Sequence, residues 1–470
     1  GTGEQHRSGD SYYGCGVLRS TDGGATWAQV GASVFDDAPG GGATIARVVL
    51  KPGTPTTVFV ASSRGLFRSL NSGTSWQLVL SGRVSDLVAD PTNGDVLYAG
   101  LANRNAASDG VHKSIDGGDT WNRMATGFAP GSLFRINLDI APSSPQTLFA
   151  GVVDGNDITN LLGVYTTVDG ASTWSKVTAT GLSCTQCWYD MFVSVHPTDP
   201  STVYFGAVGL YKSTDAGVTF SRIGTQIHVD QHFLAYDPQD PATVFVGNDG
   251  GIYKSVNGGT TWTTLNTNLA LTQFYSGLSL HPSDANTALG GTQDNGTLQY
   301  VGSTSWLRVV GGDGGFTAID FLNPSTRYGE TQWSETFGGP RRSDNGGGYA
   351  RKINGINTSD AALFIPPLIM DPLTPHTLYF GTARLYRTRD RGDNWSAISD
   401  YLASGVISTI AASPANPRTI YFGTSQGDVQ ISADDGVTWN SRTNAISITG
   451  VTTATKTTTT ISSRKNCSIR

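Results

Sequence analysis

Charged residues are scarce in this sequence, and long apolar runs are missing from it. Asp, Glu, Lys and Arg together make up 14% of the 470 residues, and the formal net charge is −6. A slightly acidic chain without basic clusters is unsuited to sequence-independent binding of nucleic acid. No run of about 18 apolar residues occurs, which is the length that a membrane-spanning helix needs. We therefore expect no nucleic-acid partner and no membrane insertion.

Helical periodicity is also nearly absent, whereas glycine is abundant. Glycine accounts for 59 residues, nearly twice its usual share. A chain of this length is expected to form two or three domains. However, no linker, low-complexity tract or shift in composition interrupts it before about residue 440. We predict an all-β chain that forms one domain over residues 1–470.

One short pattern returns ten times, about every 45 residues. Its sharpest copy contains Ser20, Asp22, Gly24, Thr26 and Trp27. An Asp or Asn side chain closes such a turn by accepting hydrogen bonds from the backbone that follows. The Trp covers the turn, and we expect its indole to be buried in every copy. We call this motif the box turn and predict that it joins two strands in every copy. The copies are centred near residues 22, 71, 116, 169, 215, 257, 302, 345, 390 and 434.

A proline-containing turn followed by a short apolar strand precedes nine of the ten box turns; residues 196–206 and 237–247 are examples. Each repeat then reads as four antiparallel strands, and a period of this length is typical of a propeller blade. The sequence thus predicts a single ten-bladed β-propeller of four-stranded antiparallel blades. Only the first copy lacks the proline-marked strand. We therefore expect the tail, about 440–470, to complete the first blade and close the ring.

The chain has four cysteines. Cys184 and Cys187 form a Cys-x-x-Cys motif, but no further ligands at zinc-site spacing accompany it, which favours a local disulfide. Cys15 and Cys467 are expected to form a second disulfide if the tail closes on the first blade. The even number of cysteines favours an extracytoplasmic setting. We expect a secreted or cell-surface protein without a cofactor or a bound metal.

The box turn resembles the Asp-box, or bacterial-neuraminidase repeat, of secreted β-propellers. This group includes sialidases, two-propeller xyloglucan hydrolases and sortilin-type receptor domains. The resemblance covers nearly the whole chain, and ten copies are most similar to the ten-bladed sortilin-type ring. It implies the fold more strongly than an activity, because the motif itself is structural and lies away from functional sites.

Two glycine-rich segments resemble the stretches that carry the catalytic carboxyl groups of xyloglucan hydrolases. Asp313 lies in Gly-Asp-Gly-Gly-Phe and resembles the acid, whereas Asp249 lies in Asp-Gly-Gly-Ile-Tyr and resembles the second carboxylate. Glycoside hydrolysis needs two carboxyl groups about 5 to 10 Å apart. In that family the two face each other across a cleft between two propellers, whereas here we expect one ring to hold both. Asp294 is an alternative partner.

The other candidate site residues lie between residues 188 and 333, mostly near strand ends, where propeller loops line one mouth of the channel. His228, Asp230 and His232 alternate, so on a strand they would share one face. That face suits either a divalent metal or a polar strand lining the channel, and we favour the polar strand. Aromatic faces beside amides and carboxylates suit sugars or peptides. The predicted ligand-binding residues are Trp188, Tyr189, Asp190, His228, Asp230, His232, Asp294 and Trp333.

Three functions are compatible with these observations. Our main interpretation is a non-catalytic binding or scaffold module for a glycan, peptide or protein ligand. The first alternative is a glycoside hydrolase that uses Asp249 and Asp313. The second alternative is a structural exoprotein that self-associates through its threonine-rich tail. Cleavage of a polysaccharide would favour the enzyme. Retention of a ligand without cleavage would favour the binding module, and concentration-dependent oligomers would favour the structural protein.

Overall fold

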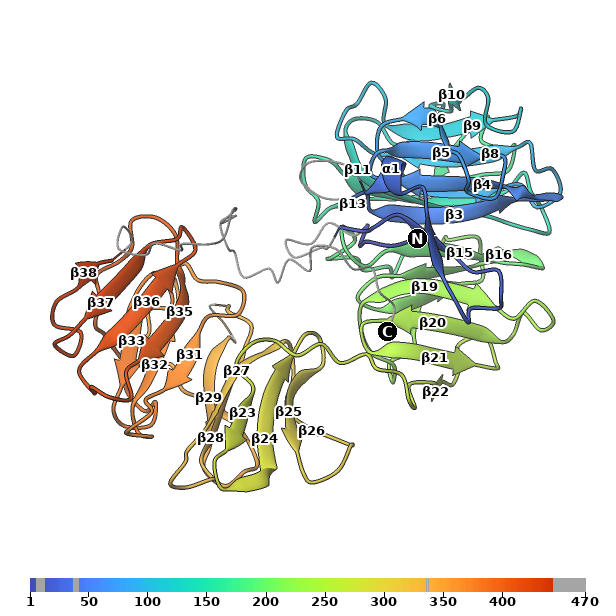
Figure 1. Ribbon diagram of the computed structural model, residues 1–470. Coiled ribbons are helices and arrows are strands. Elements are labelled where there is room, and N and C mark those ends of the chain that lie inside the picture. Colours follow the sequence, from blue (N-terminus) through green and yellow to red (C-terminus); the bar gives the residue numbers. More distant parts are fainter. Residues whose placement is uncertain (6–12, 37–41, 335, 337, 443–470) are drawn as a thin grey trace. The chain divides into compact units, whose positions relative to one another are not determined.

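The computed structural model describes residues 1–5, 13–36, 42–334, 336 and 338–442 (Figure 1). Among them the chain is almost entirely β-structure, with one short helix, α1 (Ala32–Phe35). The strands form ten antiparallel sheets, of which nine have four strands and the first has two. The fold class predicted from the repeat, an all-β propeller of ten antiparallel blades, is confirmed. The first blade differs from the prediction, because its described part is only a two-stranded hairpin.

The chain separates into two compact units, and the boundary lies between Leu269 and Ala270. Six sheets belong to the first unit and four to the second. Residues 443–470, including Cys467, lie outside the described residues. Closure of one ring over residues 1–470, the Cys15–Cys467 disulfide and self-association through the tail therefore stay predictions.

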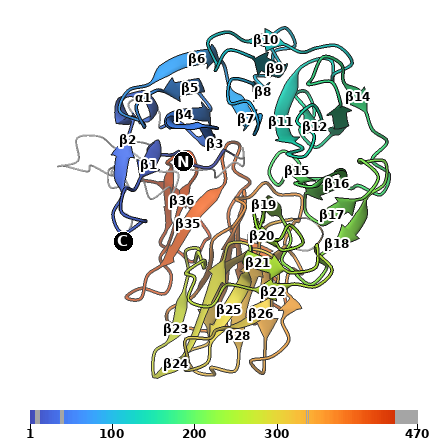
Figure 2. The ribbon, with the colours of Figure 1, turned by 90° about the vertical axis from the view of Figure 1, so that its right-hand side faces the viewer.

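The sheets of the first unit follow one another in chain order. Within each four-stranded sheet, the first strand in chain order faces the middle of the unit. The fourth strand, which follows the box turn, lies at the periphery (Figure 2). The strands are β1 (Val17–Arg19), β2 (Ala28–Val30), β3 (Ile45–Lys51), β4 (Thr54–Ser62), β5 (Gly65–Ser69), β6 (Gln77–Ser81), β7 (Val84–Ala89), β8 (Leu97–Leu101), β9 (Gly110–Ser114), β10 (Asn122–Arg123), β11 (Leu133–Ile140), β12 (Leu148–Asp154), β13 (Leu161–Thr167), β14 (Ser175–Lys176), β15 (Phe192–His196), β16 (Asp199–Gly206), β17 (Leu210–Ser213), β18 (Ser221–Ile223), β19 (Gln231–Tyr236), β20 (Val244–Asn248), β21 (Gly251–Ser255) and β22 (Thr263–Thr264).

The second unit repeats the same four-stranded meander four times. Its strands are β23 (Ser279–His281), β24 (Asp284–Thr292), β25 (Gly296–Tyr300), β26 (Leu307–Val310), β27 (Gly314–Ile319), β28 (Arg327–Thr331), β29 (Gly339–Ser343), β30 (Ala350–Arg351), β31 (Leu368–Met370), β32 (Leu378–Gly381), β33 (Leu385–Thr388), β34 (Ser396–Ala397), β35 (Ile407–Ala412), β36 (Ile420–Thr424), β37 (Val429–Ser432) and β38 (Asn440–Ser441).

Every box turn joins the last two strands of its sheet, as predicted. In the third sheet, Oδ1 of Asp116 accepts hydrogen bonds from the backbone N–H of Thr120 at 2.9 Å and from the hydroxyl of Ser114 at 2.7 Å. The hydroxyl of Thr120 donates to Oδ2 of Asp116 at 2.5 Å, and Ser114 Oγ accepts the backbone N–H of Gly118. These donors, the Thr120 hydroxyl first, hold the pKa of Asp116 well below its usual range.

The hydrophobic core lies in layers between neighbouring sheets, and the box-turn aromatic residue fills the layer on the side of the preceding sheet. Trp174 of the fourth sheet packs with Tyr98 of the third, and Trp395 of the ninth packs with Tyr328 of the eighth. Both indoles are 4% exposed. The expectation that every such indole is buried is wrong for Trp27, which is 51% exposed. Among the described residues of the first unit, no sheet precedes β1–β2 to cover it.

Candidate functional site

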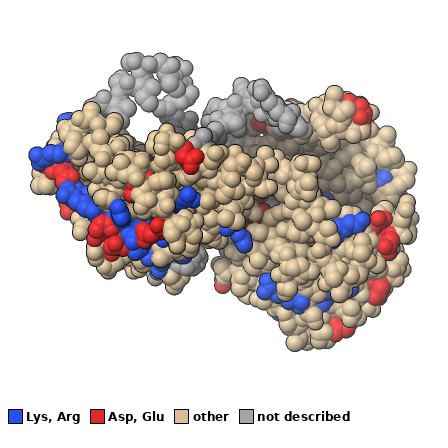
Figure 3. All heavy atoms as spheres, turned by 90° about the horizontal axis from the view of Figure 1, so that it is seen from below, with Lys and Arg blue, Asp and Glu red and all other residues tan. Residues whose placement is uncertain are grey.

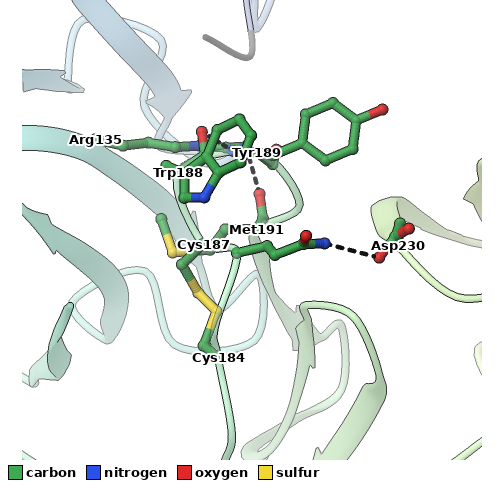
Figure 4. The surroundings of a disulfide bond; sticks show 8 residues. Arg135, Cys184, Cys187, Trp188, Tyr189, Met191 and Asp230 are labelled. Carbon is green, nitrogen blue, oxygen red and sulfur yellow. Dashed lines mark hydrogen bonds between the residues drawn. A yellow bond between two sulfur atoms is a disulfide. The ribbon is translucent and has the colours of Figure 1, made fainter. Parts of the chain in front are cut away.

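A short loop before β15 carries several of the predicted site residues. Cys184 and Cys187 form a disulfide across it, with their Cα atoms 5.5 Å apart, so the local disulfide predicted from the Cys-x-x-Cys motif is confirmed (Figure 4). Cys187 is fully buried in the layer between the fourth and fifth sheets. The side chains of Trp188 and Tyr189 follow directly, with their ring centroids 5.7 Å apart. The disulfide therefore fixes the backbone from which these aromatic residues project.

Asp249 lies in the turn between β20 and β21, and its side chain is only 7% exposed. Its Oδ1 lies 2.5 Å from Nε2 of His232 on β19, and its Oδ2 accepts a hydrogen bond of 3.2 Å from the Tyr189 hydroxyl. The His232 and Tyr189 rings meet edge to face, with centroids 4.9 Å apart. A Cβ atom at Gly250 would lie 2.3 Å from Cβ of His228, so this turn needs glycine there. The structure thus brings together four residues that the sequence singled out.

Asp190 and Asp230 form a second part of the same cluster. The amide of Gln186, which lies between the two cysteines, donates to Oδ1 of Asp230 at 3.3 Å; Figure 4 shows this bond as a dashed line. Asp190 is 0% exposed and contacts the Asp230 carboxyl group. Burial, followed by the charge of Asp230, raises the pKa of Asp190 to about 9. Burial also raises the pKa of Asp230, and the neighbouring charge of Asp249 adds to this shift.

The prediction that His228, Asp230 and His232 share one face of a strand is wrong. Only His232 belongs to β19, whereas the other two precede the strand. Asp230 has a left-handed backbone, with φ 63°, so the alternation of side chains breaks there. The ring of His228 lies against its own chain, with Nδ1 3.1 Å from the carbonyl oxygen of Val229. Among the described residues, no group of three or more His, Cys, Asp or Glu side chains is arranged to hold a metal ion.

Arg135 on β11 is a residue of this site that the sequence analysis missed. Its guanidinium group donates to the carbonyl oxygens of Tyr189 at 2.5 Å and Met191 at 2.6 Å, which ties the disulfide loop to the neighbouring sheet. Burial lowers the pKa of Arg135 to about 10, although the charge of Asp190 opposes this shift. The signal in the sequence was an arginine between apolar residues of a predicted strand, in the segment 133–138. A buried arginine of this kind needs several acceptors.

In the second unit, Asp313 directly precedes β27. Its side chain and its backbone form hydrogen bonds with two other residues, which hold it in place. The backbone N–H of Asp294 donates to Oδ1 of Asp313 at 2.8 Å. The backbone N–H of Asp313 donates to Oε1 of Gln332, and the backbone N–H of Gln332 donates to the carbonyl oxygen of Asp313, both at 3.0 Å. Asp294 has a positive φ of 61°, a sparsely populated conformation that is often found at functional sites. Asp313 and Asp294, the proposed alternative partner, are therefore in direct contact.

A fully buried carboxyl group, Glu330 on β28, lies beneath the segment that follows Asp313. Its Oε1 accepts the backbone N–H of Phe316 at 2.9 Å, whereas its buried Oε2 has no hydrogen-bond partner among the residues that the structure describes. A Cβ atom at Gly315 would lie 2.3 Å from Oε1 of Glu330, which explains the glycine at this position. Burial raises the pKa of Glu330 well above its ordinary value. The buried position favours the neutral acid.

Trp333, a predicted ligand-binding residue, packs within the second unit. Its ring lies 5.5 Å from that of Phe380, and its Nε1 donates to the carbonyl oxygen of Asp360 at 3.3 Å. A mostly apolar hollow of about 530 Å³ lies nearby along β23, β27 and β31, and Phe316 is one of its walls. Neither Asp313 nor Trp333 lines this hollow.

Acidic and basic side chains alternate on the face shown in Figure 3, and neither sign forms an extended patch there. Many of the charged groups are paired; Arg342 with Asp393 and Arg387 with Asp435 are examples. In the described part of the chain, no helix is long and apolar enough to cross a membrane.

Comparisons with known proteins identify similar enzymes. No family model matches the sequence. It is 28% identical over 267 residues to a xyloglucanase of Paenibacillus sp. and 29% identical over 231 residues to a xyloglucanase of Hypocrea jecorina. These matches cover 47% and 44% of this chain and 25% of each relative. A probable oligoxyloglucan-reducing end-specific xyloglucanase of Neosartorya fischeri is 25% identical over 364 residues, which are 62% of this chain and 42% of that protein.

The chain thus matches between a quarter and less than half of the length of these curated relatives. Among solved structures, the GH74 enzyme of Niastella koreensis is 18% identical, with a TM-score of 0.52 over 90% of this chain and 73% of that one. An ancestral GH74 enzyme is 17% identical, with a TM-score of 0.53 over 91% and 73%. These structures support the β-propeller fold. The sortilin-type and Asp-box assignments have no support among these proteins.

Proposed function

We propose that this chain is a secreted glycoside hydrolase, or the propeller part of one, that acts on xyloglucan or a related β-linked polysaccharide. This is the alternative that the sequence analysis placed second to a non-catalytic binding module. The named activity of the similar proteins favours it. The observation that carries it is Asp249, a mostly buried carboxyl group that contacts His232 through one oxygen and the Tyr189 hydroxyl through the other.

Two carboxyl groups have to divide the chemistry of hydrolysis between them. In our proposal Asp313 donates a proton to the glycosidic oxygen as the bond to the anomeric carbon breaks. Asp249 then acts either as the base that removes a proton from the attacking water or as the nucleophile itself, which corresponds to the inverting and the retaining course. Asp313 is held on a glycine-rich turn by Asp294 and Gln332. Asp249 belongs to the first unit and Asp313 to the second, and their pairing stays a proposal.

The test is a measurement of reducing ends released from xyloglucan, mixed-linkage β-glucan and cellulose by the whole chain. We expect release from xyloglucan, with a loss of at least about 100-fold in Asp313→Asn, because general acid catalysis contributes about 10²–10⁴-fold. Asp284→Asn is the matched control, since this aspartate of the second unit begins β24 and accepts hydrogen bonds from Asn286 and Thr287 of the same strand. Binding of all three polysaccharides without cleavage would contradict the hydrolase and favour a binding module.

A further inference from the structure

Asp190 is a buried carboxyl group that receives no hydrogen bond from another residue in the described part of the chain. Asp190 is 0% exposed, and as long as it and Asp230 are both ionised, neither Oδ1 nor Oδ2 of Asp190 has a hydrogen-bond partner among the described residues. The polar group in contact with it is the carboxyl group of Asp230, which also only accepts hydrogen bonds when ionised. Two ionised carboxylates in contact away from water repel each other strongly. The two carboxyl groups can therefore stay in contact only if a proton or a cation lies between their oxygens.

The charged groups around the pair come from the fourth and the sixth sheet and do not neutralise it. Arg135 approaches from β11, but its hydrogen bonds go to the carbonyl oxygens of the disulfide loop. His228, His232 and Asp249 approach Asp230 from the sixth sheet. No third carboxylate, cysteine or histidine joins the two carboxyl groups in an arrangement that holds a metal ion among the described residues. The surroundings therefore favour a proton over a cation.

We propose that Asp190 holds a proton at neutral pH and donates it in a hydrogen bond to Asp230, and that this pair is a positioning element for Asp249. The raised pKa of Asp190 supports the assignment of the proton to this side of the pair. The proton removes the buried negative charge of Asp190, so this carboxyl group needs no counter-ion. Asp230 is then the acceptor both of this proton and of the amide of Gln186.

The pair is linked to Asp249 through one short stretch of chain. Gln186 and Tyr189 belong to the disulfide loop, and they contact Asp230 and Asp249, respectively. Asp190 follows Tyr189 directly, and its own backbone N–H donates to the carbonyl oxygen of Gln186 at 3.0 Å. A second ionised carboxylate at Asp190 would push this loop away from Asp230 and would move the Tyr189 hydroxyl with it. The role of Asp249 as a catalytic group rests on the proposed function, whereas the proton on Asp190 does not.

The test is infrared spectroscopy of the whole protein at neutral pH, in which a protonated carboxyl group gives a carbonyl band separate from that of carboxylates. We expect a wild-type band that Asp190→Asn reduces by one carboxylic-acid equivalent. Glu330→Gln is the matched control, because it removes another buried acid with a raised pKa and leaves the Asp190 contribution in place. Asp249→Asn is expected to leave the band unchanged, because the proposal places the proton on Asp190.

A folded Asp190→Asn protein with the full wild-type band overturns the proposal, and so does an Asp249→Asn protein that lacks the band. Stabilisation by millimolar calcium that Asp190→Asn abolishes would assign a cation to the pair and would also overturn it. Asp190→Ala distinguishes positioning from packing. The amide introduced by Asp190→Asn can donate a hydrogen bond to Asp230, so we expect this variant to match or exceed the wild-type melting temperature at neutral pH. Asp190→Ala provides no donor and is expected to lower the melting temperature. None of these measurements requires hydrolysis, so the failure of this proposal and the failure of the proposed activity are distinguishable.

Discussion

The hydroxyl of Tyr189 donates a hydrogen bond of 3.2 Å to Oδ2 of Asp249, although 60 residues separate the two in the sequence. The bond links the disulfide loop before β15 to the β20–β21 turn of the next sheet. His232 contacts the other oxygen of the same carboxyl group. The position of Asp249 is therefore determined by two sheets together, and disturbing either one should change what this carboxyl group does.

Tyr189→Phe removes this donor while keeping the aromatic ring. A hydrogen bond of this kind contributes about 0.5–1.5 kcal/mol, so we expect kcat/KM on xyloglucan to fall by up to about tenfold. Tyr421→Phe, on an exposed position of β36, is the control and should leave the rate unchanged. Equal rates for the Tyr189→Phe and wild-type proteins would show that this contact does not support catalysis.

The box-turn carboxylates should stabilise the protein at neutral pH and lose this effect in acid. The Thr219 hydroxyl and backbone, together with Ser213, lower the pKa of Asp215 to about 2. A lowered pKa contributes stability above the ordinary value of 3.8, and this contribution is lost as the pH falls through about 2. Asp215→Ala should therefore lower the melting temperature at pH 7, with a difference that shrinks towards pH 2.

Asp215→Asn is the matched control for that measurement. The chain itself uses Asn in other box turns. Asn71 and Asn257 each accept the backbone N–H of the residue four positions later and donate to the hydroxyl of that residue. We expect Asn at position 215 to keep most of the stability at pH 7 and to remove the acid dependence. An Asp215→Asn protein with the same pH dependence as the wild type would assign that dependence to other groups.

Trp174 is one of the most buried box-turn tryptophans and Trp27 is the most exposed among the described residues, so replacing each by alanine should lower the free energy of unfolding by very different amounts. Trp174→Ala empties a layer between two sheets, where a buried aromatic residue contributes about 3–5 kcal/mol. Trp27→Ala should cost less than about 1 kcal/mol, because half of this side chain already faces solvent. Chemical denaturation of both variants checks the difference. A large cost at Trp27 would mean that another part of the protein covers this indole in solution.

Glu330→Gln should stabilise the protein increasingly as the pH rises. Burial raises the pKa of Glu330 above its ordinary value of 4.5, so the contribution of this residue to stability is fully present below that value. The protein loses this contribution as the pH rises towards the pKa of the folded state. Each unit of difference between the two pKa values costs about 1.4 kcal/mol. Melting temperatures measured from pH 4 to pH 8 should diverge in favour of Glu330→Gln, and parallel curves would contradict a neutral Glu330.

The repeat gave a reliable prediction of local structure because each box turn is held by groups within a few residues of one another. In the third sheet, Ser114, Asp116, Gly118 and Thr120 close their turn through hydrogen bonds with one another. The spacing of the motif then predicted ten blades, because one hairpin of this kind ends each sheet. Exposure of Trp27 was not predictable in this way, because its burial depends on whether another sheet lies beside β1–β2.

The site was predictable as a list of residues but not as a set of contacts. Glycines and polar side chains after strands pointed to Asp249, Asp190 and Asp230. The contact between Asp190 and Asp230 depends on how two neighbouring sheets align, which a spacing of 40 residues does not reveal. The assumed alternation at 228–232 failed because the backbone of Asp230 is left-handed. Such a conformation in a non-glycine residue is imposed by its surroundings.

The most direct test of the account is the initial rate of xyloglucan depolymerisation by the Asp249→Asn protein. Asp240→Asn is its control, because Asp240 closes the turn before β20 in the same sheet and should leave the rate unchanged. The account predicts that the wild type and Asp240→Asn cleave the polymer, whereas Asp249→Asn is slower by about 10²–10⁴-fold. Equal rates for Asp249→Asn and the wild type would contradict it.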